Sequence, residues 1–220
     1  LKTIPGFSAI RSGGTNGDPV LRGMFGSRLN ILTNGGVMLG ACPNRMDPPT
    51  SQVALNRIRE VEILKGPHAL RYGIGLGGTI NYIQEAPDFT STPGIYGRVS
   101  SLVETNGDVW RNDARVGFQG NKYDIGVLGS YSTGNDYLDG DGNLVPANFK
   151  RGTVGLYADF QPTQKDLVQV SINRNFARDV DFPSLGMDLR TDDTWMGSVK
   201  HSRTFAGKSL SQWSNSIYFT

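Results

Sequence analysis

The sequence predicts a chain dominated by β-structure, in which a small α+β domain precedes the antiparallel strands of a transmembrane β-barrel that is not closed. Residues 1–86 mix short apolar runs with turns of Gly, Pro and Asn. From Ile95 onward, apolar and polar residues alternate over much longer segments, which is the pattern of a sheet with two different faces. The connections between these segments also differ regularly in length, as the connections of a membrane barrel do.

Within residues 1–86, three elements are expected. The run Leu29–Thr33 is a short strand that ends at Asn34-Gly35-Gly36, a strong turn signal. Residues Ser51 to Leu55 are expected to form one helical turn. The stretch Ile58–Ile83 places two strands around a Gly-Pro turn and a glycine-rich loop. A Pro-rich connection without periodicity, 86–94, separates this domain from the strands that follow.

Seven long strands are expected in residues 95–220. Each predicted segment is longer than the roughly 5–6 residues of an average soluble strand and close to the ~9–11 residues of a tilted membrane strand. Alternation is clear where Val168, Val170 and Ile172 are interleaved with polar residues. The predicted segments are 95–106, 109–119, 122–134, 149–161, 166–178, 191–204 and 208–220.

After the first tight turn, the expected connections alternate between short and long. Gly120-Asn121, 162–165 and 205–207 are short, whereas 135–148 and 179–190 are long. Short turns on the periplasmic side and longer loops on the extracellular side give a membrane barrel this rhythm. Seven strands cannot close a large barrel, and an open edge in lipid leaves backbone groups unpaired. We therefore expect further strands beyond Thr220.

Composition limits the alternatives. The hydrophobic fraction is 37% and the mean hydropathy is −0.32, and no apolar run approaches the ~20 residues of a membrane helix. The net charge of +2 is too small to indicate a nucleic-acid partner. One cysteine excludes an intrachain disulfide. The chain begins at Leu1 without a readable leader, which we interpret as a cut inside a longer protein.

Three segments carry a resemblance to a known family. They are Leu21-Arg22-Gly23-Met24-Phe25-Gly26, then Arg57 through Pro67 (RIREVEILKGP), and Tyr72 through Ile83 (YGIGLGGTINYI). In this order they resemble the plug domain of the TonB-dependent outer-membrane receptors. The resemblance implies a plug in residues 1–86, the first barrel strands in 95–220, and a place in the outer membrane of a Gram-negative bacterium. Lipid and the inner-membrane TonB complex are the implied partners, the latter through a segment upstream of Leu1.

The segment Cys42-Pro43-Asn44-Arg45-Met46 is the candidate metal site. A turn through Pro43 and Asn44 can bring the Met46 thioether beside the Cys42 thiolate, and donors that are all sulfur select Cu(I) over harder divalent ions. A free thiol is also a liability in an oxidising periplasm. A structural cysteine beside a packing methionine is the alternative interpretation.

Within the receptor family, the copper-binding outer-membrane proteins are most similar here. The resemblance implies a Cys-x-x-x-Met in the plug, which Cys42 and Met46 match, completed by a His-x-Met from a barrel strand. That second half is absent, because His68 precedes Ala69-Leu70 and His201 precedes Ser202-Arg203. It is expected just beyond Thr220.

Two further methionines are weaker candidate ligands. Met38 is nearest to Cys42 in sequence, and Met187 lies in a long connection that could pass metal inward. Packing is the simpler interpretation of both. No Ser-His-Asp or paired-carboxylate pattern indicates catalysis, so an enzyme is not expected.

The sequence therefore predicts a receptor that binds and imports copper as Cu(I). A receptor of the same fold for a ferric siderophore or another metal chelate is the first alternative, with Cys42 purely structural. A soluble β-rich binding module is the second.

Overall fold

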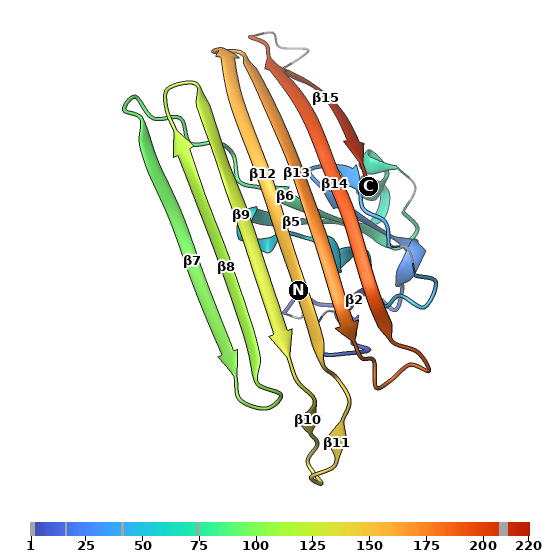
Figure 1. Ribbon diagram of the computed structural model, residues 1–220. Helices are drawn as coiled ribbons and strands as arrows, with labels where there is room; N and C mark the ends of the chain where they lie inside the picture. The colour runs from blue at the N-terminus through green and yellow to red at the C-terminus, as the bar shows by residue number, and fades with distance from the viewer. Residues whose placement is uncertain (1–2, 16, 41, 74, 207–210) are drawn as a thin grey trace.

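A computed structural model describes residues 3–15, 17–40, 42–73, 75–206 and 211–220. Its main feature is a seven-stranded antiparallel sheet in which each strand pairs with the next long strand along the chain, in the order β15-β14-β13-β12-β9-β8-β7. The N-terminal part of the chain packs behind this sheet (Figure 1). The seven strands are β7 (Gly94–Glu104), β8 (Val109–Gln119), β9 (Tyr123–Gly134), β12 (Phe149–Thr163), β13 (Asp166–Val180), β14 (Leu189–Thr204) and β15 (Gln212–Phe219).

The predicted fold class is confirmed. All seven expected segments contain a strand, and three of them are longer than predicted because β12, β13 and β14 extend into their connections. Residues 208–210 of the last segment lie outside the described part of the chain. A two-residue hairpin, β10 (Tyr137–Leu138) with β11 (Leu144–Val145), was not expected and lies within the long connection 135–148.

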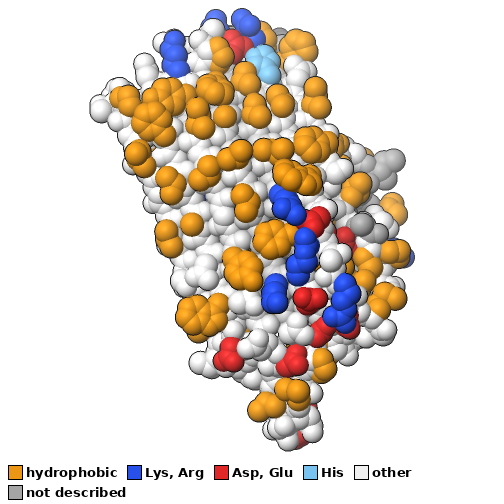
Figure 2. Space-filling model, in the orientation of Figure 1, with side chains coloured by type: hydrophobic (Ala, Val, Ile, Leu, Met, Phe, Trp, Pro, Cys, Tyr) orange, Lys and Arg blue, Asp and Glu red, His pale blue; other side chains and the backbone are white. Residues whose placement is uncertain are grey.

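The two faces of the sheet differ sharply in chemistry. Side chains that point away from the N-terminal part are apolar and exposed, and Figure 2 shows them gathered over the strands. They include Ile95, Val99, Val116, Phe118, Ile125, Val127, Val154, Leu156, Val170, Ile172, Val199 and Ile217. Residues of the opposite parity are polar and buried, among them Asp124, Thr153, Asp159, Ser171, Asn175 and Ser202. This is the lipid-out, polar-in alternation of a membrane barrel.

A four-stranded sheet forms the centre of the N-terminal part, in the order β4-β3-β6-β5. Its strands are β3 (Leu29–Thr33), β4 (Gly36–Val37), β5 (Ile58–Leu64) and β6 (Gly78–Gln84). β3 runs parallel to β6, and β5 runs antiparallel to it. The first cluster of apolar side chains lies on this sheet and comprises Phe7, Leu21, Leu29, Ile31, Met38, Ile80 and Tyr82.

Gly78 begins β6 in a conformation that only glycine adopts easily. Its φ is +135°, and a Cβ there would lie 2.8 Å from the Leu64 carbonyl oxygen and 3.0 Å from a Leu21 methyl group. A residue with a side chain would therefore be disfavoured at this position both by the backbone conformation and by the lack of space. This accounts structurally for one glycine of the sequence motif that ends the N-terminal part.

The remaining N-terminal elements are short. The hairpin pairs β1 (Phe7–Ile10) with β2 (Asp18–Leu21). The helical component is made of 3-10 segments, which are η1 (Gly26–Arg28), η2 (Pro49–Gln52), η3 (Leu55–Arg57) and η4 (Gly66–Tyr72). The single helical turn expected over Ser51 to Leu55 is not observed, because η2 and η3 overlap only its two ends and Val53 and Ala54 between them are not helical. Among the described residues, no helix is both long and apolar enough to cross a membrane.

The long connections lie at one end of the sheet. The connection 135–148 joins β9 to β12, and 181–188 joins β13 to β14, both at the end where β10 and β11 project (Figure 1). The turns 120–122 and 164–165 lie at the opposite end. We call the first the long-loop end. From 120–122 to 181–188, short and long connections therefore alternate along the chain, as predicted.

Two glycines make room for a pair of tyrosines on the inward face of the sheet. Tyr96, Gly117, Gly126 and Tyr157 lie in one row across β7, β8, β9 and β12. The two tyrosine hydroxyl oxygens are 2.6 Å apart and hydrogen-bonded. A Cβ at Gly126 would lie 2.6 Å from the Val116 carbonyl oxygen and closer still to the Tyr157 hydroxyl.

We expect Gly126→Ala to destabilise the sheet by about 1–3 kcal/mol, because overpacking forces neighbouring groups to move. Gly129→Ala on the same strand is the matched control, since the nearest atom to its Cβ would be the Thr153 carbonyl oxygen at 3.8 Å. Thermal unfolding of the full-length protein in detergent measures both. Equal midpoints for the two variants would contradict the packing role of Gly126.

Candidate metal site

The segment from Cys42 to Met46 forms a tight turn. The Arg45 amide donates to the Cys42 carbonyl oxygen at 3.0 Å, and Arg45 has a φ of +59°. The Arg45 guanidinium binds Asp18 on β2 through both carboxylate oxygens, at 2.8 and 2.6 Å. The Cys42 amide donates to Asp47 at 2.9 Å. Because bidentate Arg–carboxylate pairs are strong and geometrically specific, the turn has a fixed shape.

This turn brings both predicted sulfur donors to one apolar cluster. The Met46 side chain is buried in it, and Cys42 is half-buried and packs against it. Val109 begins β8, Phe149 begins β12, and Val180 ends β13, so the cluster lies at the long-loop end. The predicted proximity of Cys42 and Met46 is compatible with this packing, although their role as metal ligands stays a prediction.

The other two candidate methionines, Met187 and Met38, lie in different parts of the structure. Met187, in the connection 181–188, accepts a hydrogen bond from the Asn44 side chain at 3.3 Å and is 49% exposed. Its sulfur therefore lies against the Cys42–Met46 turn. Met38 is buried in the first cluster, with its sulfur accepting from the Thr33 hydroxyl at 2.8 Å.

Neither histidine lies in this turn. His68 is on η4, and His201 is on β14, where it contacts Asp166 at 3.0 Å near the short-turn end. Within the described ranges, no three or more His, Cys, Asp or Glu side chains gather as a metal group. The Cys42 and Met46 sulfurs are the predicted ligands at this turn, which the carboxylates of Asp18 and Asp47 also contact.

Polar residues that sequence reasoning did not identify support the turn. A guanidinium nitrogen of Arg151, on β12, donates to the Met46 carbonyl oxygen at 3.4 Å. Nearby, burial raises the pKa of the Asp181 carboxyl, and the charge of Asp188 adds to the effect. Arg151 and Met46 are 105 residues apart, and no local pattern would have paired them.

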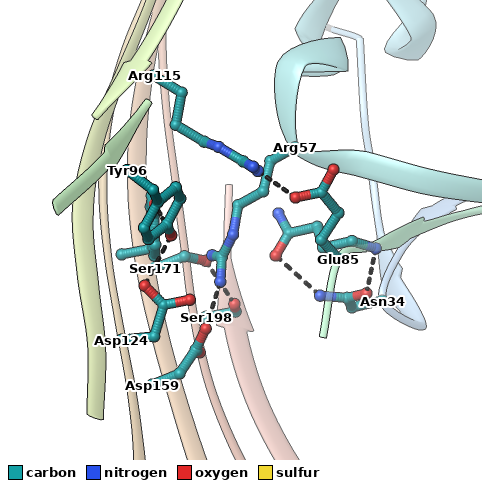
Figure 3. A network of polar contacts seen from close by, with 11 residues as sticks. Asn34, Arg57, Glu85, Tyr96, Arg115, Asp124, Asp159, Ser171 and Ser198 are labelled. Atoms are coloured by element: carbon teal, nitrogen blue, oxygen red, sulfur yellow. Dashed lines mark hydrogen bonds and ion pairs between the residues drawn. The ribbon is translucent and has the colours of Figure 1, made fainter. Parts of the chain in front are cut away.

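A second polar network joins the N-terminal part to the inward face of the sheet (Figure 3). Arg57 binds Asp159 on β12 at 2.5 Å, and both side chains are almost fully buried. The Arg57 guanidinium also lies 3.9 Å from the centre of the Tyr157 ring. Arg115 on β8 pairs with Glu85. These contacts set the position of the N-terminal part relative to the strands.

Comparison with known proteins decides the family. Residues 1–79 match the model of the TonB-dependent Receptor Plug Domain. This part of the chain is the plug domain of a TonB-dependent receptor. The predicted resemblance is therefore confirmed, and so is the outer membrane of a Gram-negative bacterium as the location. Its relatives are transport receptors rather than enzymes, and a soluble β-rich module does not fit this family.

The receptor resembles several solved structures. It is similar to the copper transporter OprC, with a TM-score of 0.91 and 34% identity over 99% of this chain and 33% of that one. It also matches the ferric enterobactin receptor PfeA from Pseudomonas aeruginosa, with a TM-score of 0.69, 16% identity, and coverage of 98% of this chain and 37% of that one. The latter identity supports the fold alone.

Two curated relatives match part of the receptor. A hemin receptor of Yersinia pestis is 35% identical over 83 residues, which cover 37% of this chain and 12% of the relative. A hemin receptor of Yersinia enterocolitica is 38% identical over 84 residues, with the same coverage. The chain thus spans about one third of the solved copper transporter, and the matched segment is a small part of the hemin receptors.

The buried Arg57–Asp159 pair is expected to stabilise the packing of the plug against the strands. Removing one partner of a buried ion pair leaves an uncompensated charge, so Arg57→Met should destabilise the plug by about 3–5 kcal/mol. Arg57→Met with Asp159→Leu should recover most of that loss. Hydrogen exchange of the β5 amides in the full-length receptor measures the local stability.

Arg59→Met is the matched control, because Arg59 is 58% exposed and pairs with the equally exposed Glu60 at 3.6 Å. Exposed pairs contribute about 0–1 kcal/mol, so β5 exchange should hardly change. Equal exchange in Arg57→Met and the unmodified receptor would disprove the anchoring role.

Proposed function

We propose that this receptor binds copper as Cu(I) through Cys42 and Met46 and imports it across the outer membrane. The observation that carries the proposal is the packing of both sulfur-bearing side chains against one apolar cluster at the long-loop end of the sheet. In outer-membrane barrels the longer loops are extracellular. The turn therefore lies where cargo arriving from outside would first meet the plug.

The chemistry of the turn favours a soft ion. Thiolate and thioether donors select Cu(I), whereas hard divalent ions prefer oxygen. The Met46 side chain packs against the apolar side chains of Val109, Phe149 and Phe182. The 34% identity with the copper transporter OprC over nearly the whole of this chain supports the same cargo.

Further ligands are needed around the ion. Met187 is a candidate third sulfur, since the Asn44 amide already holds it at the turn. The His-x-Met pair that the family resemblance implies is proposed to follow Thr220. Met38 is not proposed as a ligand, because it packs in the other cluster.

Transport is proposed to follow the family's mode of action. Binding at the turn would change the plug, of which the turn is a part, and the inner-membrane TonB complex would supply energy through a segment upstream of Leu1. The buried Arg57–Asp159 pair and the Arg115–Glu85 pair join the plug to the strands, so plug movement would have to break them. Outer-membrane lipid would contact the apolar face of the sheet.

A receptor for a metal chelate is the second candidate function. The solved ferric enterobactin receptor and the two hemin receptors support it. In that case Cys42 would be structural, and the Cys42–Met46 turn would not contact the cargo.

Copper titration of the full-length receptor separates the two. We expect Cys42→Ser and Met46→Leu each to weaken Cu(I) affinity by about a hundredfold or more, since losing even an outer-shell partner of a metal ligand costs about 10–100-fold. Competition with a chromogenic Cu(I) chelator measures the affinity. Met38→Leu is the matched control and should bind as the unmodified receptor does.

Unchanged Cu(I) affinity in Cys42→Ser would eliminate copper binding at this turn. Titration of the same variants with ferric enterobactin and hemin then tests the second function. Tight binding of either chelate, insensitive to Cys42→Ser, is the result that would support it.

A further inference from the structure

Arg151 on β12 reaches from the sheet to the backbone of the predicted metal ligand Met46. Its guanidinium donates to the Met46 carbonyl oxygen at 3.4 Å, and its Nε atom is buried without a hydrogen-bond partner among the described residues. A buried donor without a partner costs free energy, and an apolar side chain of similar size would avoid that cost. Packing of the strands therefore does not explain an arginine at this position.

Two carboxylates, one from the plug and one from the strands, orient this guanidinium. Asp47, at the end of the Cys42–Met46 turn, and Asp192 on β14 both act on the charge of Arg151. Asp47 also accepts a hydrogen bond from the Cys42 amide at 2.9 Å. The same carboxylate thus acts on Arg151 and fixes the backbone of the other predicted ligand.

The register of the strands brings Asp192 towards Arg151. Arg151, Ala177 and Asp192 lie in one row across β12, β13 and β14. Because the Ala177 side chain is small, the longer side chains on either side of it can approach each other over it. Asp192 also accepts a hydrogen bond from Gln52 of η2 at 3.1 Å. Polar contacts therefore lead from the turn to the strands and back to the plug.

The turn depends on such contacts because its backbone is strained. Arg45 has a φ of +59°, which a residue other than glycine keeps only where the surrounding structure holds it. The Arg45 side chain is held by Asp18, and the next residue, Met46, is held by Arg151. Loss of the second contact would leave the direction of the Met46 side chain less well fixed.

We propose that Arg151 is a positioning residue for Cu(I), which holds the Met46 backbone so that the thioether faces the Cys42 thiolate. This inference rests on the proposed function, because the role requires that the turn binds copper. A guanidinium has donors but no acceptor, so Arg151 would not contact the ion itself. It would act through Met46, as an outer-shell partner of the metal.

Cu(I) titration of the full-length receptor tests this role. We expect Arg151→Met to weaken the affinity about tenfold or more, as loss of an outer-shell partner commonly does. Arg151→Gln is the second variant, which keeps a polar group at the buried position, and should show a similar loss. Arg151→Lys keeps a cation with hydrogen-bond donors and should recover most of the affinity.

A double-mutant cycle distinguishes positioning of Met46 from a general effect on folding. In a Met46→Leu background, Arg151→Met should weaken Cu(I) binding little further, because both changes act on one ligand and their effects are not additive. X-ray absorption of the copper-loaded Arg151→Met variant should show fewer or longer copper–sulfur contacts than in the unmodified receptor. An unchanged sulfur shell would contradict the positioning role.

Arg115→Met is the matched control. Arg115 is also an inward arginine that contacts the plug, through Glu85, and its Nε atom is likewise buried without a partner in the described part of the chain. It belongs to the network of Figure 3 and not to the Cys42–Met46 turn, so its variant should bind Cu(I) as the unmodified receptor does.

Three results would overturn the role of Arg151. They are no loss of affinity in Arg151→Met, an equal loss in Arg115→Met, and a full further loss when Arg151→Met is added to Met46→Leu. Unchanged affinity in Cys42→Ser would instead overturn the proposed function. The two failures are therefore distinguishable in one set of titrations.

Discussion

The period-two alternation of the seven long strands is the constraint on which the other features depend. Because successive side chains point to opposite faces, one face of the sheet is apolar and exposed, and the other face meets the plug. Apolar residues such as Val127 and Leu156 are exposed on the first face, whereas Asp159 and Asn175 are buried on the second. A shift of one residue in any strand would exchange these environments. The Cys42–Met46 turn packs on the plug side of this separation, against inward residues such as Phe149 and Ala177.

Much of the architecture could be predicted from the sequence because it depends on local pattern. Alternation located the long strands, and Gly120-Asn121 and the Pro-rich connection marked their limits. β12, β13 and β14 were predicted too short, since pairing with neighbouring strands continues past the clear alternation. The β10–β11 hairpin contains only two residues per strand, too few to show a period.

The candidate site was inferred from residues that are close in sequence, and their role as ligands stays a prediction. Cys42 and Met46 share one turn, so their spacing was informative. Met38 is nearer to Cys42 in sequence than Met187 is, yet the plug sheet holds Met38 in another cluster while a loop places Met187 beside Asn44. The Arg57–Asp159 pair spans 102 residues. Such contacts depend on strand register across the whole sheet. This register cannot be predicted from any single segment of the sequence.

The Met187 and Met46 sulfurs differ in their exposure to solvent, and this difference has a chemical consequence. Met187 is 49% exposed whereas Met46 is 7% exposed, so an oxidant from outside reaches Met187 first. Its sulfoxide would carry an oxygen that accepts the Asn44 hydrogen bond more readily than a thioether does. That same oxygen is a poor ligand for a soft ion. Oxidation would therefore change Met187 first, while the buried Met46 stayed a thioether.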